Sequence, residues 1–598
     1  MQFFILFIVG AVIIGAGAML SPAWPSAQPR VGLASAFALA LVVGGAVFWA
    51  NLFGWQTLVI DYLLFALVSI VILGGTMAQA QTRAEARGEE LLDRDMGWPG
   101  PEDLAFLGLV IVLCALPLAR FDFPVGRDAA GDAMITLAAR TGGTFDSLLP
   151  FHPEITGIVA PGFYALAAYL SQQLHQPIPL IHMAIGAVVA FLCVWTTYDL
   201  GAEIQDKRLG RAMALALLMS LGVLRLYWDS HFSDLMGVLF ALAFSTYALR
   251  AIRHHLPLDM VAAGLMLGAV LYVSPGMFML TLAGYLVLLL ASNIPPDSVE
   301  KGIPPAPPTI LNILGLWKGV PLVAFLGTAP WLFTHWDGIE RLLSNWNFQY
   351  QVFAESSFQD LLLVQGFWMI PVVIWGILIS WRADRRIALW GLGSLALSFA
   401  LYPPKASIIQ SVAAPLPNPA QAQALAPLIP YALFGGFALL RFYDNFPQSL
   451  RVFLHRYRYL WAGLGLISLI GLFQLSNLWL GTDYPQSIAP DDLAAMRWLE
   501  ENTAEDARIF NHPDALWASS TIGRETAFIA VPEGFFAPDF PVSSELAEYW
   551  QAPQGAISPG FEYILVPQWA EDPFAGSTAL EVVFQQGAAV VYQARQAE

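Results

Sequence analysis

The stretch from Ala119 to Gln176 reads ARFDFPVGRDAAGDAMITLAARTGGTFDSLLPFHPEITGIVAPGFYALAAYLSQQLHQ. It lies between two long apolar segments, but glycine, proline and charged residues interrupt it too often for a simple membrane span. Three carboxylates, Asp122, Asp128 and Asp132, stand near its start. Acidic groups held close to a bilayer are costly and usually have a function. We therefore expect the chemistry of the protein to be centred on this stretch.

Composition places the chain in a broad class. Of its 598 residues, 57% are hydrophobic and only 12% are charged, and the mean hydropathy is +0.59. Apolar runs of about 20 residues recur along the chain, which is typical of a helical protein that crosses a membrane many times. The first run, Gln2–Leu20, lacks a basic segment before it, so we interpret it as a helix and not as a signal peptide.

The apolar runs predict an α-helical polytopic membrane protein of about 14 transmembrane helices with a small C-terminal α/β domain. We divide it into N-terminal helices at 1–102, a core at 103–482 with its first outer loop at 119–177, and a C-terminal domain at 483–598. The predicted spans are 2–20, 31–53, 57–78, 103–119, 178–200, 209–227, 232–252, 258–275, 277–292, 314–334, 362–381, 386–402, 424–441 and 459–481.

Orientation follows from the bias of lysine and arginine toward cytoplasmic loops. The basic loops share one side only if residues 157–174 do not cross the membrane. We therefore predict an interfacial helix at 157–174, lying on the outer surface. The loop 119–177 and the C-terminal domain then both lie outside a multi-pass plasma membrane protein. The basic residues are Arg83, Arg87, Arg94, Lys207, Arg208, Arg211, Arg250, Arg253, Arg382, Arg385, Arg386, Arg441, Arg451, Arg456 and Arg458.

The C-terminal region differs in composition from the rest of the chain. From Tyr484 to the end there are 17 acidic and 4 basic residues, which argues against nucleic acid as a partner. Helix signals occur at 491–502, and short runs typical of strands at 527–531, 563–566 and 589–592. These patterns predict a small α/β domain on the outer face, through which protein partners could bind.

Asp128 and Asp132 are four residues apart. If residues 128–140 form a helix, as the apolar spacing indicates, both carboxylates lie on one face. Two such acids can share a proton, bind a cation, or act as a base and its orienting group. The alternative is a solvated helix start, where aspartate is favoured by the helix dipole. A bound cation would be a hard divalent ion such as Mg²⁺ or Mn²⁺, but two acids are few for a metal site.

The order of these parts resembles the GT-C superfamily of bacterial cell-envelope glycosyltransferases, which take sugars from polyprenyl phosphates. In that superfamily the first outer loop carries an acidic motif followed by juxtamembrane helices. The similar pieces here are Gly126–Asp132, Gly142–Gly143 and Ala160–Tyr164. The loop departs from the usual pattern because it has neither a contiguous Asp-Glu nor an Asp-x-Asp.

A second resemblance lies in the C-terminal region, which is similar to the outer domain of many bacterial proteins of this type. The residues that carry it are Met496–Thr503, Asp506–Ile509, Thr521–Arg524, Phe561–Val566 and Val590–Tyr592.

The resemblance implies transfer of a sugar from a lipid-linked donor in the membrane to an acceptor hydroxyl. Asp128 or Asp132 would be the general base, contributing about 10²–10⁴-fold. Arg225, Arg341 and Lys405 are candidates to hold the leaving phosphate, although interfacial snorkelling explains such residues equally well.

Three further residues complete the predicted substrate-binding set. Asp229 and His231 belong to a polar turn at 228–234 that could line a sugar pocket, although a histidine there is more often a hydrogen-bonded loop residue. Asp122 is a charge partner at the membrane edge, close to Arg120.

Two other classes of function stay open. The first is a non-catalytic membrane scaffold subunit of a larger assembly, and the second is a lipid or polysaccharide transporter. An enzyme should hold its aspartate inside the protein near a basic residue and a groove for lipid. A transporter would need a polar path through the bundle.

Overall fold

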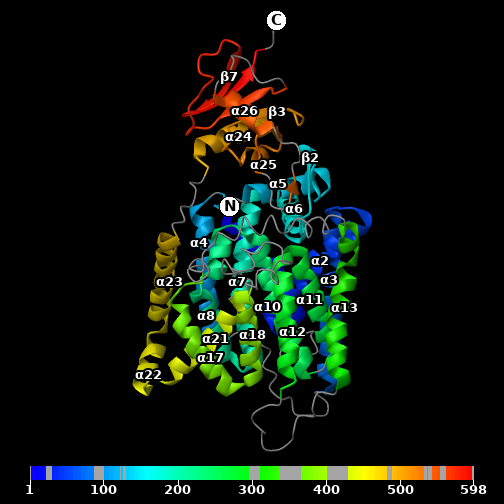
Figure 1. Ribbon diagram of the computed structural model, residues 1–598, viewed down its shortest axis with the longest axis vertical. Helices are drawn as coiled ribbons and strands as arrows, with labels where there is room; N and C mark the ends of the chain where they lie inside the picture. Colours follow the sequence, from blue (N-terminus) through cyan, green and yellow to red (C-terminus); the bar gives the residue numbers. More distant parts are fainter. Residues whose placement is uncertain are drawn as a thin grey trace, which may run out of the picture.

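A computed structural model shows a bundle of long helices with a small α/β domain above one end (Figure 1). We name that end of the bundle the domain end and the opposite one the far end. The structure describes residues 2–21, 30–85, 100–121, 123–125, 129–254, 256–294, 310–336, 365–400, 428–480, 488–530, 535–536, 542–551 and 560–595.

Each predicted span overlaps a helix of the bundle over its described residues, and the span 209–227 overlaps two. These helices are α1 (Gln2–Leu20), α2 (Val31–Phe53), α3 (Leu58–Glu85), α4 (Pro101–Arg120), α7 (Ile178–Ile204), α8 (Lys207–Met219), α9 (Gly222–Trp228), α10 (Phe232–His254), α11 (Pro257–Val273), α12 (Pro275–Ser292), α13 (Ile310–Thr334), α17 (Met369–Ala383), α18 (Arg385–Ala400), α21 (Leu428–Asp444), α22 (Gln448–Arg456) and α23 (Arg458–Leu480). Helix α22, between two predicted spans, was not expected.

The chain is a helical membrane protein. Within the described residues, five helices are long and apolar enough to cross a membrane, or six if the bent pair α8–α9 forms one span. The larger number of 14 spans stays a prediction, because many of the matching helices are shorter than a bilayer core of about 30 Å requires.

The predicted helix 209–227 is broken in the structure. Helices α8 and α9 meet at an angle of 49°, and Leu221 between them has a φ of 58°. A Cβ on Gly222 would lie 2.2 Å from the Leu428 side chain and 2.7 Å from that of Gln365. The bend is therefore tied to close packing against residues more than 140 positions away, which no local pattern reveals.

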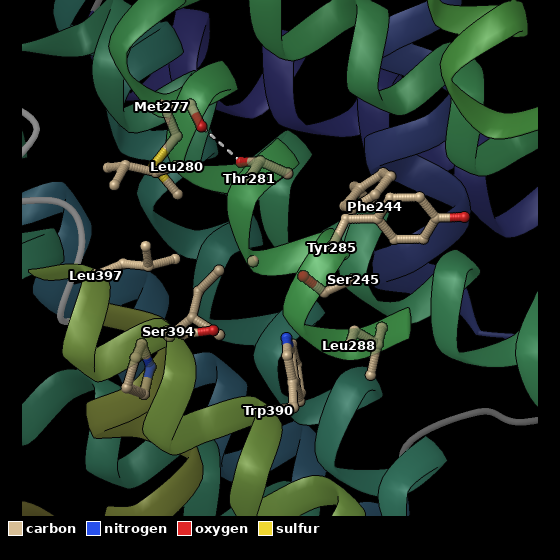
Figure 2. A pocket seen from close by; sticks show the side chains of 13 residues that line it. Phe244, Ser245, Met277, Leu280, Thr281, Tyr285, Leu288, Trp390, Ser394 and Leu397 are labelled. Carbon is tan, nitrogen blue, oxygen red and sulfur yellow. Dashed lines mark hydrogen bonds between the residues drawn. The ribbon is translucent and has the colours of Figure 1, made fainter. Parts of the chain in front are cut away.

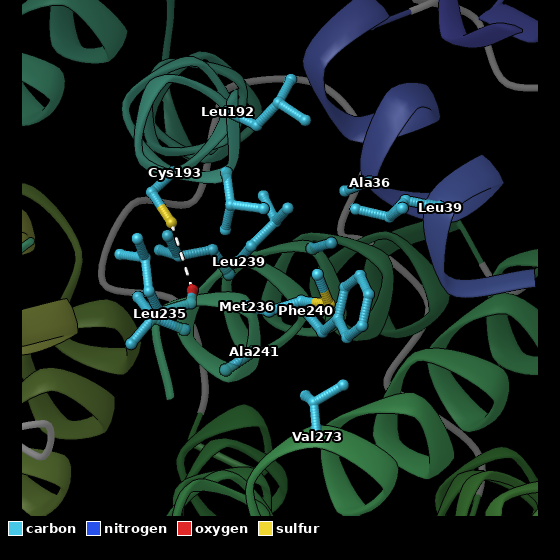
Figure 3. Packing of buried hydrophobic residues seen from close by; sticks show 14 of the residues in the cluster. Ala36, Leu39, Leu192, Cys193, Leu235, Met236, Leu239, Phe240, Ala241 and Val273 are labelled. Atoms are coloured by element: carbon cyan, nitrogen blue, oxygen red, sulfur yellow. Dashed lines mark hydrogen bonds between the residues drawn. The ribbon is translucent and has the colours of Figure 1, made fainter. Parts of the chain in front are cut away.

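The core surrounds α7, in which every residue except Glu203 is buried. Apolar side chains of α2, α7, α10 and α11 interlock there, among them Leu39, Leu192, Phe240 and Val273 (Figure 3). A helix that is buried on all sides is expected to be apolar around its whole circumference.

The first outer loop folds into helix α5 (Ala129–Gly142), a hairpin of β1 (Ser147–Leu148) and β2 (His152–Gly157), and helix α6 (Gly162–Leu174). With 13 residues, α6 is about 20 Å long and too short to span a bilayer. It is not exposed on a surface as an interfacial helix would be, since nine of its 13 residues are buried, and its place on the outer side stays a prediction. It packs against α2, α5, α7, α10 and α11.

The C-terminal domain is a five-stranded mixed sheet with order β4-β3-β6-β8-β7. Helix α24 packs on the face that contains Ile509 and Leu565, and α26 on the face that contains Phe510 and Ile564. Its elements are α24 (Pro490–Asn502), β3 (Arg508–Asn511), α25 (Ala518–Ile522), β4 (Glu525–Thr526), β5 (Phe535–Phe536), α26 (Val542–Gln551), β6 (Tyr563–Val566), β7 (Leu580–Gln586) and β8 (Ala589–Ala594).

Sequence patterns located most of this domain. The predicted helix 491–502 corresponds to α24, and the predicted strands 563–566 and 589–592 to β6 and β8. The third predicted strand, 527–531, is wrong over its described residues. They follow the two-residue strand β4 and have no strand pairing of their own.

The domain is attached to the first outer loop. Strand β5 extends the hairpin by antiparallel pairing of Phe535 and Phe536 with Gly157 and Thr156. Trp517 packs edge-on against Phe123, with ring centroids 5.2 Å apart. The two regions therefore share a sheet and an aromatic contact, although more than 350 residues separate them in sequence.

The far end of the bundle contains a network of charged residues that the apolar runs of the sequence did not predict. The Arg250 guanidinium donates to the Glu203 carboxylate at 2.9 Å, and the two side chains are 3% and 10% exposed. Asp199, one turn earlier on α7, accepts the Leu33 backbone N–H at 2.8 Å. These contacts join α2, α7 and α10, and buried charges of this kind are kept only when they are paired.

Candidate functional site

Asp132 is the described member of the predicted acidic pair. It lies in the first turn of α5 and is half-buried. The Tyr164 hydroxyl, from α6, donates a hydrogen bond of 2.7 Å to its carboxylate. A carboxylate at a helix N-terminus is favoured by the helix dipole, and a charge-assisted hydrogen bond fixes its orientation. Asp132 is therefore held against the protein and is not a freely solvated helix start.

Close packing at Gly162 sets the position of Tyr164. A Cβ at Gly162 would lie 2.7 Å from the Val43 side chain and 2.8 Å from the Tyr272 carbonyl oxygen. Only glycine allows α6 to approach α2 and α11 this closely. The Pro-Gly pair at the start of α6 thus determines where the Tyr164 hydroxyl meets the acid.

Below Asp132, a buried polar contact joins α5 to α7. The Thr136 hydroxyl donates to the Asp132 carbonyl oxygen at 3.1 Å, and His182 Nε2 lies 2.8 Å from the same hydroxyl. The His182 ring packs edge-on against Phe163 and Phe232, with centroids 4.9 and 6.2 Å away. His182 itself is fully buried.

Arg225 lies at the domain end of the bent pair α8–α9. It is buried, and its guanidinium lies over the Phe473 ring of α23, 5.7 Å from the centroid. Trp228, one turn later, contacts both Phe473 and Phe121. Snorkelling, the alternative explanation for Arg225, would instead place its guanidinium in water.

The polar turn at 228–234 is partly buried. Asp229 caps α9 through its backbone N–H, which donates to the Arg225 carbonyl. His231 is half-buried, and its carbonyl oxygen accepts the Leu235 N–H at the start of α10, next to the buried Asp234. The Ser274 hydroxyl donates to the Asp234 carboxylate at 2.6 Å, so this turn contacts the start of α12.

A pocket opens between α10, α12, α18 and α21 (Figure 2). Its cavity volume is about 40 Å³. Leu280, Leu288, Leu397 and Trp390 give it an apolar surface, with a few hydroxyls such as Thr281. It lies along α12 from Met277, which follows Ser274 by three residues, to Leu288. Asp132 does not line it.

Four predicted site residues, Asp122, Asp128, Arg341 and Lys405, lie outside the described residues. Whether Asp128 shares a face with Asp132 therefore stays a prediction. A divalent cation would need several oxygen ligands. Across the described ranges no group of three or more His, Cys, Asp or Glu side chains could hold a metal ion, and the expected cation at Asp128 and Asp132 stays a prediction.

The C-terminal domain brings the Glu500 carboxylate near Arg140, at the end of α5. Burial lowers the pKa of Arg140, at the end of α5, against the opposing effect of Glu500. Burial also raises the pKa of Glu500, against the attraction of Arg140. Glu500 stays exposed and Arg140 half-buried, and the contact between the domain and the loop is made by α25 packing on α5.

His335, just after α13, also anchors the loop. Burial lowers its pKa, but the hydrogen bond and the charge of Asp146 outweigh burial, so the pKa is raised overall. His335 Nε2 lies 3.0 Å from the Asp146 carboxylate, and Nδ1 lies 2.9 Å from the Trp331 carbonyl oxygen. The imidazolium form satisfies both acceptors.

This pair predicts a pH-dependent stability. A raised folded-state pKa contributes stability that is fully present below the unfolded value of about 6.5 and is lost as the pH rises through the folded pKa. We expect a contribution of up to about 1 kcal/mol. Thermal unfolding of the wild type and of Asp146→Asn, from about pH 5.5 to 8.5, measures it. Parallel pH profiles for the two proteins would contradict the assignment.

No protein-family model matches the chain, and no curated protein matches its sequence. Among solved structures, the chain is similar to the archaeal oligosaccharyltransferase AglB from Archaeoglobus fulgidus, in complex with an inhibitory peptide and a dolichol-phosphate. That match has 13% identity and a TM-score of 0.46, and covers 77% of this chain and 69% of that chain.

Two other structures of the Archaeoglobus fulgidus oligosaccharyltransferase are similar to a comparable degree. One, tethered to an acceptor peptide, has 12% identity and a TM-score of 0.44, and the match covers 77% of this chain and 68% of that chain. The other, a complex with Zn and sulfate, has 12% identity and a TM-score of 0.43, with 77% and 67% covered.

Proposed function

We propose that this protein transfers a sugar from a lipid-phosphate donor to an acceptor hydroxyl at the outer membrane face, with Asp132 as the general base. The observation that carries the proposal is the Asp132 carboxylate, held at 2.7 Å by the Tyr164 hydroxyl. It lies where the bundle, the first outer loop and the C-terminal domain come together. Asp128 is the other candidate base.

Sugar transfer requires that the two reactants are held in position and that one base accepts a proton. Asp132 takes the proton of the acceptor hydroxyl as its oxygen attacks the anomeric carbon of the donor sugar. The bond from that carbon to the phosphate oxygen breaks, and the lipid phosphate leaves with the electron pair. A positioned carboxylate contributes about 10²–10⁴-fold to such a step, and fixing the two reactants contributes more.

Arg225 is the predicted cation that lies among the described residues, and we assign it to the lipid phosphate. It is buried at the same end of the bundle as Asp132, on a helix that contacts α7. A guanidinium in a site shielded from water binds phosphate more strongly than an exposed one. Asp229 and His231 follow in the turn after α9 and would contact the sugar.

The apolar pocket suits the hydrocarbon chain of the donor. It extends from the domain end of α12 along the bundle, below the Asp234–Ser274 contact. A lipid chain gains about 0.8 kcal/mol for each CH₂ group removed from water. The transporter alternative is disfavoured, because apolar side chains fill the contacts among α2, α7, α10 and α11 (Figure 3).

The test is a transfer assay with full-length protein in liposomes. Radiolabelled sugars on a polyprenyl phosphate are offered with hydroxyl acceptors, and the same sugars on a nucleoside diphosphate serve as the control donor. We expect release of polyprenyl phosphate and labelled product from the lipid donor alone. Absence of both transfer and lipid-donor binding would overturn the proposal and favour the scaffold alternative.

A pocket-filling variant tests the lipid site. A Cβ at Gly284 would meet only the Ser394 hydroxyl, at an ordinary 3.5 Å, so the side chain of Gly284→Leu enters the pocket without straining the backbone. Losing the burial of about two CH₂ groups, or roughly 1.6 kcal/mol, should raise KM for a long-chain donor about tenfold.

The matched control is Gly315→Leu on α13, where a Cβ meets nothing within 4 Å. A short-chain donor provides a second control, since it should not reach the pocket. An equal change in KM for short and long donors would show that the pocket does not hold the chain.

A further inference from the structure

The C-terminal domain carries an aromatic cluster that the proposed transfer step does not use. It consists of His512, Trp550 and Trp569. The His512 ring is wedged between two indoles, with centroids 4.7 Å from Trp569 and 5.0 Å from Trp550, and it is nearly perpendicular to both. Trp550 is buried, but 54% of Trp569 is exposed. The cluster therefore presents one open indole beside an imidazole.

The cluster lies at the carboxyl ends of two parallel strands. His512 follows the last residue of β3, and Trp569 comes three residues after β6, its parallel neighbour. In α/β sheets, this edge is where ligands bind, since loops from adjacent strands converge there. Trp550 comes from α26, so three separate elements form the cluster.

Hydrogen bonds fix the segments that carry the cluster. The Asn511 side chain is fully buried and exchanges two bonds of 2.9 Å with the Phe528 backbone. On the other side, the Gln568 N–H donates to the buried Asp492 carboxylate at 2.6 Å. A rigid arrangement of this kind lowers the entropy that a ligand must overcome.

The histidine offers a defined donor. Its Nδ1 accepts the Asp514 backbone N–H at 3.1 Å, and burial lowers the pKa of His512 despite the nearby Asp514 carboxylate. At neutral pH the ring is therefore uncharged and carries its proton on Nε2. The Asp514 carboxylate is largely exposed and provides an acceptor nearby.

An apolar face beside a neutral donor and an acidic acceptor matches one ligand chemistry. A pyranose ring has a face of C–H groups that packs on an indole and a rim of hydroxyls that both donate and accept. The domain is strongly acidic, with 17 acidic and 4 basic residues from Tyr484 onward, which disfavours phosphates and other anions.

We infer that His512, Trp550 and Trp569 form a saccharide-binding site, in which a pyranose ring stacks on Trp569 and its hydroxyls bond to His512 Nε2–H and Asp514. The inference rests on the proposed function in taking this saccharide to be part of the acceptor. The site would hold the acceptor away from the reacting hydroxyl and so confer specificity.

The test is binding of full-length protein in nanodiscs to a printed glycan array, with no donor present. The variant is Trp569→Ala, an exposed position whose loss should leave the fold intact. The matched control is Trp498→Ala, on the opposite face of the sheet, where Trp498 stacks on Phe584. We expect the wild type and the control to bind pyranose glycans, and Trp569→Ala to bind at least about tenfold more weakly.

The outcomes separate this inference from the proposed function. Absence of glycan binding by the wild type, or equal binding by Trp569→Ala, would overturn the saccharide site even if transfer is observed. Glycan binding that is lost in Trp569→Ala, without any transfer activity, would retain the site while the transfer proposal fails. His512→Gln keeps a side-chain donor and should retain part of the affinity.

Discussion

Asp132→Asn is expected to lower the rate of sugar transfer about 10²–10⁴-fold, because the amide cannot take a proton from the acceptor hydroxyl. The fold should be unaffected, since an asparagine oxygen still accepts the Tyr164 hydrogen bond of 2.7 Å. Steady-state transfer from a polyprenyl-phosphate donor measures the effect. A smaller KM change than kcat change would show that the carboxylate acts in the reaction step.

Three further variants test whether a loss of rate in Asp132→Asn identifies Asp132 as the base. Tyr164→Phe removes a donor that stabilises the charged carboxylate, so we expect a partial loss of rate and an acid limb of the pH–rate profile that moves to higher pH. Glu154→Gln, an exposed acid of the same loop, is the control and should have wild-type rates. Asp128→Asn tests the second candidate. Wild-type turnover in Asp132→Asn together with a loss in Asp128→Asn would transfer the role of base to Asp128.

Arg250→Met is expected to lower the free energy of unfolding by up to about 3–5 kcal/mol, because the Glu203 carboxylate loses its closest cation and keeps the half-exposed His254 at 3.5 Å. In the native protein the two groups are 2.9 Å apart, and their side chains are 3% and 10% exposed. Asp199, one turn earlier on α7, would also lose a neighbouring positive charge. Unfolding in mixed detergent micelles, followed by tryptophan fluorescence, measures the change.

The matched control is Arg386→Met, which removes an arginine paired with Asp384 at 3.2 Å where both side chains are partly exposed. Such a pair contributes only about 0–1 kcal/mol. The double variant Arg250→Met, Glu203→Gln should regain part of the loss, since it removes the unpaired charge. Equal losses for the two arginines would mean that the network at the far end has no special role.

The apolar runs were sufficient to locate the helices of the bundle. A long helix in lipid must satisfy its own backbone polar groups, so length and hydropathy alone identify it. The start of α5 near Asp132 and the mixed α/β character of the C-terminal domain were also readable from the sequence, because turn residues and short-range periodicity report local backbone structure. Composition likewise excluded a soluble fold.

Features that depend on contacts between distant segments were not readable. The sequence indicated a surface position for α6, since its polar C-terminal end resembles that of an interfacial helix, yet α5 and four bundle helices cover it. No pattern in the sequence indicated that His182, near the start of a span, is buried against Thr136. The bend between α8 and α9 arises from packing at Gly222, which carries no local signal of its own.

The sequence by itself determined that this is a helical membrane protein with an acidic α/β domain, and that its polar loop at 119–177 carries the candidate acids. Only the tertiary structure decided that Tyr164 holds Asp132, that Arg225 is buried against Phe473, and that His512 stands between two tryptophans. The reason is physical. Hydropathy and periodicity depend on residues within one or two turns, whereas burial and hydrogen-bond partners depend on which remote segments pack together.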